Sequence, residues 1–281
     1  MEHDLPITPE ILRLIKNALA EDIGSGDITT RCTIPADHRS EGTILAKSDA
    51  VVAGLPLVPF VLEAAGGDVS LTLSASDGMR VTAGEIIARL SGNTRTLLAA
   101  ERVILNLMQR LSGIATLTGL YVDAVLGLPV KILDTRKTTP GLRALEKYAV
   151  RVGGGRNHRF GLFDAVLIKD NHITASGGVA EAIRLAKSCA PHMLKVEVEV
   201  GTLDQLRVAL DCGADVIMLD NMSAETMREA VKIAAGRVPL EASGNVTLST
   251  VRAIAETGVD YISAGSLTHS ASAADISLKI K

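Results

Sequence analysis

Positive charge is concentrated between residues 136 and 169. Eight lysine and arginine residues fall in this segment against two acidic residues, Glu146 and Asp164, so its formal charge is +6 in a chain whose total is −3. Arginine binds carboxylates and phosphates through two parallel hydrogen bonds. The segment therefore predicts a pocket for small anions. Its cations are Arg136, Lys137, Arg143, Lys147, Arg151, Arg156, Arg159 and Lys169.

These cations do not all support a pocket equally. Arg143, Lys147 and Arg151 are spaced by four residues. A solvated helix face explains that spacing as well as an anion site does. The cations that flank predicted strands favour a site more strongly, and they are Arg136, Lys137, Arg159 and Lys169.

A glycine-rich loop lies within the basic segment. Residues 153–155 are three glycines, and they precede the run Arg-Asn-His-Arg at 156–159. Glycine allows a backbone to approach a ligand closely. The chain has no G-K-[ST] sequence, so this loop is not a Walker loop. The position of His158 in the run favours a functional role, whereas His172 and His269 fit a structural role equally well.

Acidic residues occur within and at the end of two predicted strands. Glu197 and Glu199 alternate in the run VEVEV and so share one strand face, and Asp220 ends the next strand. Buried carboxylates need cations or hydrogen-bond donors. Glu199 and Asp220 are suited to Mg²⁺ or sugar hydroxyls. For the two glutamates, an ion pair with Lys195 or Lys169 is the structural alternative.

Small polar residues follow the last two predicted strands. Loops of this kind bind phosphate through backbone amides at the mouth of α/β barrels. Each is also an ordinary helix cap, so the sequence leaves both interpretations open. The two loops are Ser243-Gly244-Asn245 and Ala264-Gly265-Ser266.

Short apolar runs alternate with helical segments in the second half of the chain. This alternation indicates parallel strands joined by right-handed crossovers. The repeat of about twenty-two residues suits a barrel, whose active site lies at the carboxyl ends of the strands. Polar residues follow nearly every predicted strand at its carboxyl end. The runs are 130–133, 165–168, 196–200, 216–219, 239–242 and 261–264, and the helical segments are 178–189, 202–211, 223–235 and 247–257.

The first half predicts an α+β unit. Thr8-Pro9-Glu10 is a typical helix start, and the helix should run to about Asp22. Residues 40–90 are typical of short strands separated by turns. Residues 94–125 predict a long helix in which Gly113 and Gly119 mark breaks or points of close packing.

Composition excludes several classes of protein. Aromatic residues make up 2% of the chain, too few for the stacking platforms of single-strand binders. The near-neutral total argues against a nucleic-acid or membrane partner. Three distant cysteines, Cys32, Cys189 and Cys212, predict a reducing compartment with neither disulfide nor zinc site. The acidic start of the chain and the short apolar run at 50–62 predict a cytoplasmic protein.

The run LDTRKTTPGLRALEKYAVRVGGGRNHRFGLFDAVLIKDNHI at 133–173 resembles the quinolinate phosphoribosyltransferases, also called nicotinate-nucleotide pyrophosphorylases (carboxylating). The resemblance covers essentially the whole chain. A molybdenum-operon relative shares T-R-K, G-G-G and H-R but departs from the segment L-I-K-D-N-H, which is intact here. Further matching runs are EDIGSGDIT at 21–29, ERVILNLMQRLSGIATLT at 101–118, VEVEV at 196–200, LDN at 219–221, ASGN at 242–245 and SAGSLTHS at 263–270.

The resemblance implies an α/β fold with two domains. Residues 1–108 would form an N-terminal α/β sandwich, joined by the C-terminal tail 271–281, and residues 109–270 an open, incomplete α/β (TIM-like) barrel. It also implies a homodimer, sometimes a higher assembly, with a shared active site. In that dimer Arg102 would reach into the neighbouring subunit's site.

The resemblance further implies a reaction and its residues. Quinolinate and phosphoribosyl pyrophosphate would give nicotinate mononucleotide, pyrophosphate and carbon dioxide in de novo NAD biosynthesis. Lys137, Lys169, Glu199 and Asp220 would be catalytic, and Glu199 and Asp220 would hold Mg²⁺ and ribose hydroxyls. The 5′-phosphate would bind the two polar loops, and Lys137 would face the phosphoribosyl donor. Thr135 would be a further substrate-binding residue. The quinolinate carboxylates would bind Arg136, His158, Arg159 and Lys169.

Three alternatives stay open on sequence alone. One is a phosphoribosyltransferase of the molybdenum-operon type with another substrate. A second is a barrel enzyme that forms a Schiff base at Lys169. The third is a nucleic-acid-binding module built on the basic segment, which acids such as Glu199 and Asp220 would oppose.

Overall fold

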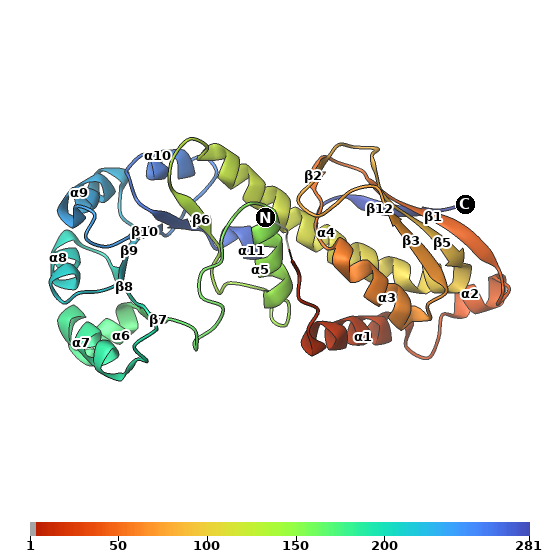
Figure 1. The fold of residues 1–281 in the computed structure, drawn as a ribbon, viewed down its shortest axis with the longest axis horizontal. Helices are drawn as coiled ribbons and strands as arrows, with labels where there is room; N and C mark the ends of the chain where they lie inside the picture. Colours follow the sequence, from red (N-terminus) through yellow and green to blue (C-terminus); the bar gives the residue numbers. More distant parts are fainter. Residues whose placement is uncertain (1–3) are drawn as a thin grey trace. The chain divides into compact units, whose positions relative to one another are not determined.

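The protein is described here by a computed structural model that covers residues 4–281. The chain divides into two compact units (Figure 1). The first comprises the residues up to Gly119 together with 140–154 and 271–281, and the second comprises 120–139 and 155–270. The expected arrangement has one boundary in the middle of the chain, at 108/109. In the structure the chain passes from the first unit to the second after Gly119, returns to the first for residues 140–154, and then enters the second again.

The first unit begins with the expected helix. Helix α1 (Pro9–Ile23) starts at Thr8, whose hydroxyl accepts a hydrogen bond from the Ile11 amide, and ends at Gly24. Its buried side chains, Ile11, Ile15 and Leu19, recur every four residues and so form one apolar stripe. Helix α1 packs on α3 (Val58–Ala65).

Four antiparallel strands form the main sheet of this unit, in the order β12-β1-β5-β3. The strands are β1 (Arg39–Ala46), β3 (Val69–Leu73), β5 (Ile86–Asn93) and β12 (Ile276–Ile280). Strand β12 comes from the end of the chain and pairs with β1 from Gly42↔Ile280 to Ala46↔Ile276. The remaining elements are α2 (Ile28–Thr33), β2 (Ala50–Val51), η1 (Leu55–Leu57) and β4 (Arg80–Val81).

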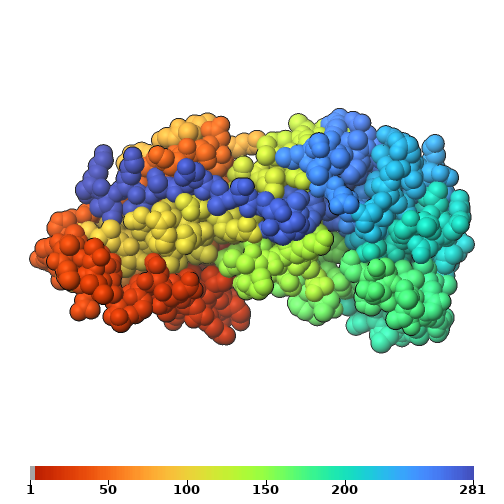
Figure 2. All heavy atoms as spheres, turned by 180° about the vertical axis from the view of Figure 1, so that it is seen from behind, coloured from red at the N-terminus to blue at the C-terminus, as the bar shows by residue number. Residues whose placement is uncertain are grey.

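The long helix α4 (Thr94–Ala124) is continuous through both of its glycines. A Cβ added at Gly113 would meet the carbonyl oxygen of Ser272 at 2.0 Å, so this glycine is a point of close packing. Figure 2 shows the C-terminal segment lying along the yellow helix. Gly119 has ordinary space, because the nearest atoms to such a Cβ lie 3.6 Å away.

Helix α5 (Arg143–Val152) places three of the eight cations in the first unit. They do not form a solvated face: Lys147 is 2% exposed, and Glu146, which is wholly buried, accepts hydrogen bonds from Arg110 at 3.0 and 2.7 Å. The Arg151 guanidinium lies 5.7 Å from the centre of the Tyr148 ring. Part of the basic segment therefore supports the fold.

The second unit is an open sheet of parallel strands in the order β6-β11-β10-β9-β8-β7. Helices lie on its outer side (Figure 1). This matches the expected incomplete barrel, because β6 and β7 form its two edges. The strands are β6 (Lys131–Leu133), β7 (Val166–Ile168), β8 (Val196–Val200), β9 (Val216–Asp220), β10 (Leu240–Ser243) and β11 (Tyr261–Ser263).

The helices of this unit follow the predicted alternation. They are α7 (Val179–Cys189), α8 (Leu203–Asp211), α9 (Ala224–Ala234) and α10 (Val251–Ala255), with two short additions, α6 (Asp170–Ser176) and α11 (Ser266–His269). Among residues 4–281, no helix combines the length and apolar character of a membrane span. The three cysteines are free thiols.

We predict that Gly113→Ala destabilises the protein by about 1–3 kcal/mol, because the new methyl group must displace the backbone at Ser272. The measurement is the free energy of unfolding in urea. The matched control is Gly119→Ala in the same helix, which should be neutral or stabilising by up to about 1 kcal/mol. Equal losses in the two variants would contradict the close-packing assignment.

Candidate active site

A cavity of about 790 Å³ lies at the carboxyl ends of the parallel strands. It is lined by residues that follow β6, β7, β9, β10 and β11, together with side chains of the strands themselves. All residues expected to bind substrate line it except Arg102 and Glu199. The expected residues in the lining are Thr135, Arg136, Lys137, His158, Arg159, Lys169, Asp220, Ser243, Gly244, Asn245, Ala264, Gly265 and Ser266.

Positive charge is crowded on one side of the cavity. Burial, followed by the nearby positive charge of Arg136, lowers the pKa of the Arg159 guanidinium, and Glu197 partly offsets this. Arg159 donates to the carbonyl of Ala165 at 3.1 Å, while its buried Nε has no hydrogen-bond partner in the described part of the chain. Adjacent guanidinium groups of this kind are stabilised by a planar anion.

A buried aspartate shapes the loop that carries His158 and Arg159. Asp134 is fully buried after β6, and its two oxygens accept from the His158 amide at 2.8 Å and from Asn157 Nδ2 at 2.6 Å. A bridge between Leu133 and Arg156 aligns the loop with the strand. The polar residues after β6 therefore fix the loop backbone as well as line the cavity.

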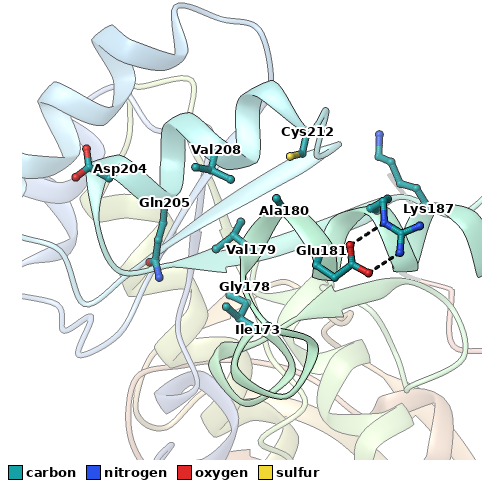
Figure 3. Close-up of a pocket in the computed structure, with 12 residues that line it drawn as sticks. Ile173, Gly178, Val179, Ala180, Glu181, Lys187, Asp204, Gln205, Val208 and Cys212 are labelled. Atoms are coloured by element: carbon teal, nitrogen blue, oxygen red, sulfur yellow. Dashed lines mark hydrogen bonds and ion pairs between the residues drawn. The ribbon is translucent and has the colours of Figure 1, made fainter.

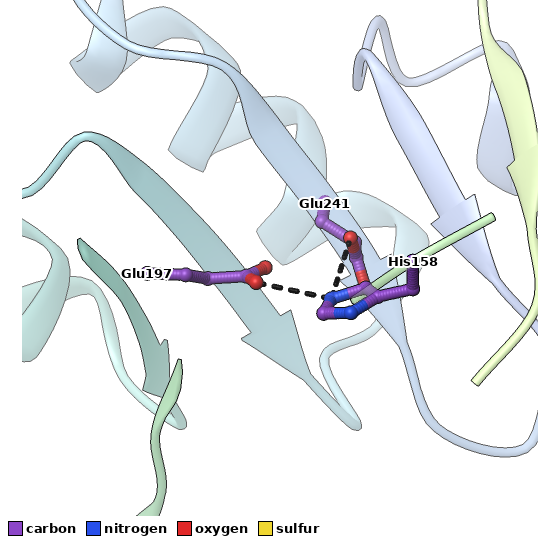
Figure 4. Close-up of side chains that lie close together, drawn as sticks. All are labelled: His158, Glu197 and Glu241. Atoms are coloured by element: carbon purple, nitrogen blue, oxygen red, sulfur yellow. Dashed lines mark ion pairs between the residues drawn. The ribbon is translucent and has the colours of Figure 1, made fainter. Parts of the chain in front are cut away.

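His158 is directed toward two buried glutamates (Figure 4). Its Nε2 lies 3.0 Å from Oε2 of Glu197 on β8 and 3.7 Å from Oε2 of Glu241 on β10. Its Nδ1 accepts a hydrogen bond from the Arg159 amide at 2.8 Å. Because an accepting Nδ1 bears no hydrogen, Nε2 carries the ring hydrogen and donates it to Glu197.

Glu241 is protonated more readily than an ordinary glutamate. Burial, with the neighbouring charge of Glu197, raises the pKa of Glu241 to about 7 despite the opposing effects of His158, Ser263 and Lys169. Two adjacent carboxylates in a buried site do not readily ionise together. Ligand atoms of His158, Glu197 and Glu241 all lie within 4.8 Å of one another.

Lys169 and Glu199 form an ion pair. Such a pair is the structural alternative to a binding role for Glu199 that the sequence left open. The Lys169 Nζ lies 2.6 Å from Glu199 Oε2, and Lys169 is the more exposed partner. On the adjacent strand, Asp220 Oδ2 accepts from Asn221 Nδ2 at 2.8 Å. Both acids offer oxygen donors at neighbouring strand ends, which fits Mg²⁺, an ion that uses one or two carboxylates together with substrate phosphates.

The loop after β10 is locked to the end of β9. Gly244 has φ +96°, and a Cβ there would meet Asn221 Oδ1 at 2.2 Å, so only glycine fits. Asn221 Nδ2 binds Asp220, and its Oδ1 accepts from Asn245 Nδ2 at 3.2 Å. Asn221 thus connects an expected metal ligand with an expected phosphate loop.

The loop after β11 contacts the chain after β6. The Thr268 hydroxyl donates to the Lys137 carbonyl at 2.7 Å, and Thr135 Oγ1 accepts from the Lys137 amide at 3.0 Å. Tyr121 lies 3.2 Å from the Ser266 hydroxyl and donates to the Val246 carbonyl at 3.3 Å. These contacts hold two parts of the cavity wall in place.

Three further residues of interest lie on α4, α6 and α11. Arg102 is exposed on α4 in the first unit, 3.7 Å from Glu101. His172 Nδ1 accepts from the Lys169 amide at 2.9 Å, so it caps α6, and His269 lines the cavity. Sequence reasoning missed Glu241, although a lone acid in the apolar strand LEAS was a usable signal.

A second cavity, of about 880 Å³, lies among α6, α7 and α8 (Figure 3). Its lining includes Val179, Val208 and Cys212, and its charged groups include the ion pair Glu181–Arg184. None of the residues expected to bind substrate lines it. The cationic cavity is therefore the candidate active site.

Comparison with protein families decides between the alternatives. The family model "Quinolinate phosphoribosyl transferase, N-terminal domain" matches residues 27–112, and its C-terminal counterpart matches residues 114–279. The chain belongs to the quinolinate phosphoribosyltransferase family. The combined matches cover both units and agree with the expected fold and family.

Individual relatives agree with this assignment. A Bacillus subtilis protein named "Probable nicotinate-nucleotide pyrophosphorylase [carboxylating]" is 47% identical over 96% of this chain and 93% of its own length. A chloroplastic nicotinate-nucleotide pyrophosphorylase from Arabidopsis thaliana is 46% identical over 97% of this chain and 83% of its own. The solved structure of the nicotinate-nucleotide pyrophosphorylase from Francisella tularensis is 43% identical, with a TM-score of 0.94 over 99% of each chain.

We predict that Glu241 makes the stability of this family member depend on pH. Its pKa is raised from 4.5 to about 7, so between these values the folded chain holds a proton that the unfolded chain lacks. The free energy of unfolding should therefore fall as pH rises through this window. Glu241→Gln should remove this dependence, so its stability relative to the wild type should change by on the order of 3 kcal/mol across the window.

Urea unfolding of wild type and variant at about half-unit pH intervals checks this prediction. The control is Glu181→Gln on α7, because the hydrogen bond from Arg184 lowers the pKa of exposed Glu181. The stability of Glu181→Gln relative to the wild type should show no comparable change between pH 4.5 and about 7. A constant difference between wild type and Glu241→Gln would contradict the prediction.

Proposed function

We propose that the protein transfers a phosphoribosyl group from phosphoribosyl pyrophosphate to quinolinate and removes a carboxylate, giving nicotinate mononucleotide, pyrophosphate and carbon dioxide. The observation that supports it most is the cavity itself. Its cations Arg136, Arg159 and Lys169 lie near the acid Asp220 and two small polar loops. Such a cavity accommodates a planar dianion beside a phosphorylated sugar.

Arg136 and Arg159 suit the carboxylates of quinolinate. Burial and the proximity of the two guanidinium groups are both unfavourable for their charges, and together they lower the pKa of Arg159. A dianion relieves that repulsion, and guanidinium groups bind carboxylates through paired hydrogen bonds. Asp134 supports this binding indirectly by fixing the loop that bears Arg159.

The opposite side of the cavity suits the donor. Lys137 lines the cavity beside the loops 243–245 and 264–266, which offer backbone amides and hydroxyls for the 5′-phosphate. Glu199 and Asp220 would hold Mg²⁺, which when bound would neutralise the pyrophosphate leaving group. Asn221 keeps Asp220 and the first loop in register.

Binding both anions in one cavity brings the ring nitrogen to the anomeric carbon. This arrangement supplies the proximity contribution to catalysis. Positive charge develops on the sugar as pyrophosphate leaves, and the carboxylates of Glu199 and Asp220 stabilise it electrostatically. When carbon dioxide leaves, the electron pair of the broken bond stays on the ring carbon, where the adjacent cationic nitrogen stabilises it until a proton is added. No covalent bond to the protein forms.

Assembly and location are part of the proposal. Arg102 is exposed on α4, and it would contribute to the site of a second copy in a homodimer. A cytoplasmic location fits the reducing environment that free thiols prefer. The molybdenum-operon alternative, the Schiff-base alternative and the nucleic-acid alternative receive no support from the family matches.

The direct test incubates purified protein with quinolinate, phosphoribosyl pyrophosphate and magnesium. Nicotinate mononucleotide, pyrophosphate and carbon dioxide should form in equal amounts, and omission of any component should stop the reaction. The products are identified by mass spectrometry and released ¹⁴CO₂. Absence of all three products from folded protein would refute the proposed function.

Arg136→Ala and Arg159→Ala should each weaken quinolinate binding by about 10–100-fold, because a charge-assisted hydrogen bond is lost. Phosphoribosyl pyrophosphate binding should change less than about threefold. Calorimetric titration with each ligand measures both constants. Arg156→Ala is the matched control, since Arg156 is exposed and lies outside the cavity lining. Equal weakening of both ligands would overturn the assignment.

Glu199→Gln and Asp220→Asn should each raise the magnesium concentration for half-maximal activity by about tenfold, because an amide is a weaker ligand than a carboxylate. Steady-state rates over a magnesium titration measure this shift. Asp204→Asn on α8 is the control, because Asp204 is exposed and pairs with Arg207. An unchanged magnesium requirement in both site variants would refute their assignment as ligands.

A further inference from the structure

The floor of the active-site cavity differs from its cationic side. We call three of the cavity's buried lining residues its floor: Leu167 is 9% exposed, Met218 is 5% exposed and Glu241 is 2% exposed. Glu241 is the only acid among these three. A carboxyl group that lines a cavity while almost fully buried is costly unless it is neutral or paired.

The surroundings of Glu241 favour its neutral form. Glu197 on β8 is an acid, and His158 donates its ring hydrogen to Glu197. Ser263 faces Glu241 from β11, and Lys169 after β7 acts on it over a distance but pairs with Glu199. Its register neighbours are Met218 on β9 and Tyr261 on β11.

One oxygen of this carboxyl group is uncommitted. Glu241 Oε2 lies 3.7 Å from His158, and its buried Oε1 makes no hydrogen bond within residues 4–281. The charged donors nearby have other partners: His158 donates to Glu197, and Lys169 donates to Glu199 at 2.6 Å. The neutral Ser263 hydroxyl is buried and has no hydrogen-bond partner within residues 4–281. Glu241 is therefore placed to act on a ligand at the cavity floor.

We propose that the carboxylic acid of Glu241 protonates the ring carbon that loses its carboxylate. This inference rests on the proposed function. The bond between the ring carbon and the carboxylate breaks, its electron pair stays on the ring carbon beside the cationic nitrogen, and carbon dioxide leaves. That pair takes the proton from Glu241, which becomes a carboxylate and regains a proton from solvent after product release.

The division of the cavity supports this role. Strong ion pairs to the departing carboxylate would stabilise the reactant and slow its loss. A neutral acid among Leu167 and Met218 avoids that stabilisation and still provides a proton. The arginines then hold the carboxylate that stays on the product. A raised glutamate pKa of about 7 keeps this acid protonated near neutral pH.

The test compares Glu241→Gln with wild type after wild type has been shown to form nicotinate mononucleotide. Loss of a general acid should lower kcat by about 10²–10⁴-fold, while the KM of each substrate changes less than about threefold. Glu241→Asp, which keeps an acid, should recover part of kcat. Cooperative unfolding and unchanged calorimetric binding of quinolinate establish that each variant is folded.

The pH profile separates catalysis from a structural role. Wild-type kcat should fall as pH rises above about 7, because the acid must be protonated, and Glu241→Gln should lack this fall. The matched control is Glu197→Gln, which alters the same histidine contact but leaves the acid in place. It should retain an alkaline fall, displaced to lower pH because the neighbouring negative charge is gone, and it should lose less kcat.

Three results would overturn the inference while leaving the proposed function intact. One is an active wild type with a Glu241→Gln variant of equal kcat and pH profile. Another is identical losses and profiles in Glu197→Gln and Glu241→Gln, which would indicate a structural cluster. The third is one equivalent of metal retained by wild type and lost in Glu241→Gln, because a cation would keep Glu241 ionised.

Discussion

The active-site cavity depends on like charges that the parallel sheet holds side by side. On its cationic side, burial and the nearby charge of Arg136 lower the pKa of Arg159, and deeper in the cavity burial and the charge of Glu197 raise the pKa of Glu241. The fold keeps these charges close together. Glu197 and Glu241 lie on β8 and β10 of the sheet, and Asp134 fixes the loop that carries Arg159. The site is thus electrostatically strained in a way that an anion on one side and a proton on the other relieve.

The sequence predicted the parts of this arrangement that follow from periodicity. Alternating runs gave the parallel strands, and the polar residues at their ends gave most of the cavity lining. The spacing of Glu197 and Glu199 gave their shared face, and the structure adds that they pair with different groups, His158 and Lys169. Local pattern determined these features, because side-chain direction alternates regularly in a strand.

Features that depend on distant contacts were not predictable in this way. Helix α5 has cations at a spacing typical of a solvated face, yet Glu146 and Lys147 are buried against the first unit. Glu241 stands out in the sequence as a lone acid in a short apolar strand, but its role depends on its proximity to Glu197 and His158. His172 belongs to a motif shared with the family, but locally it caps a helix. For Glu146, Lys147 and Glu241, the deciding contacts come from residues that are distant in the sequence. For His172 the contact is local, but its partner is the backbone amide of Lys169.

The pairing of β12 with β1 has a consequence for how the chain is made. Strand β1 uses residues from the start of the chain, and its partner on one side consists of nearly the last residues. During synthesis on a ribosome, one edge of β1 stays without its neighbour until β12 has been made. An exposed edge is prone to pair with other chains. The first unit is therefore completed only after the second unit has been synthesised, and the nascent chain has a period in which an edge-protecting chaperone would be useful.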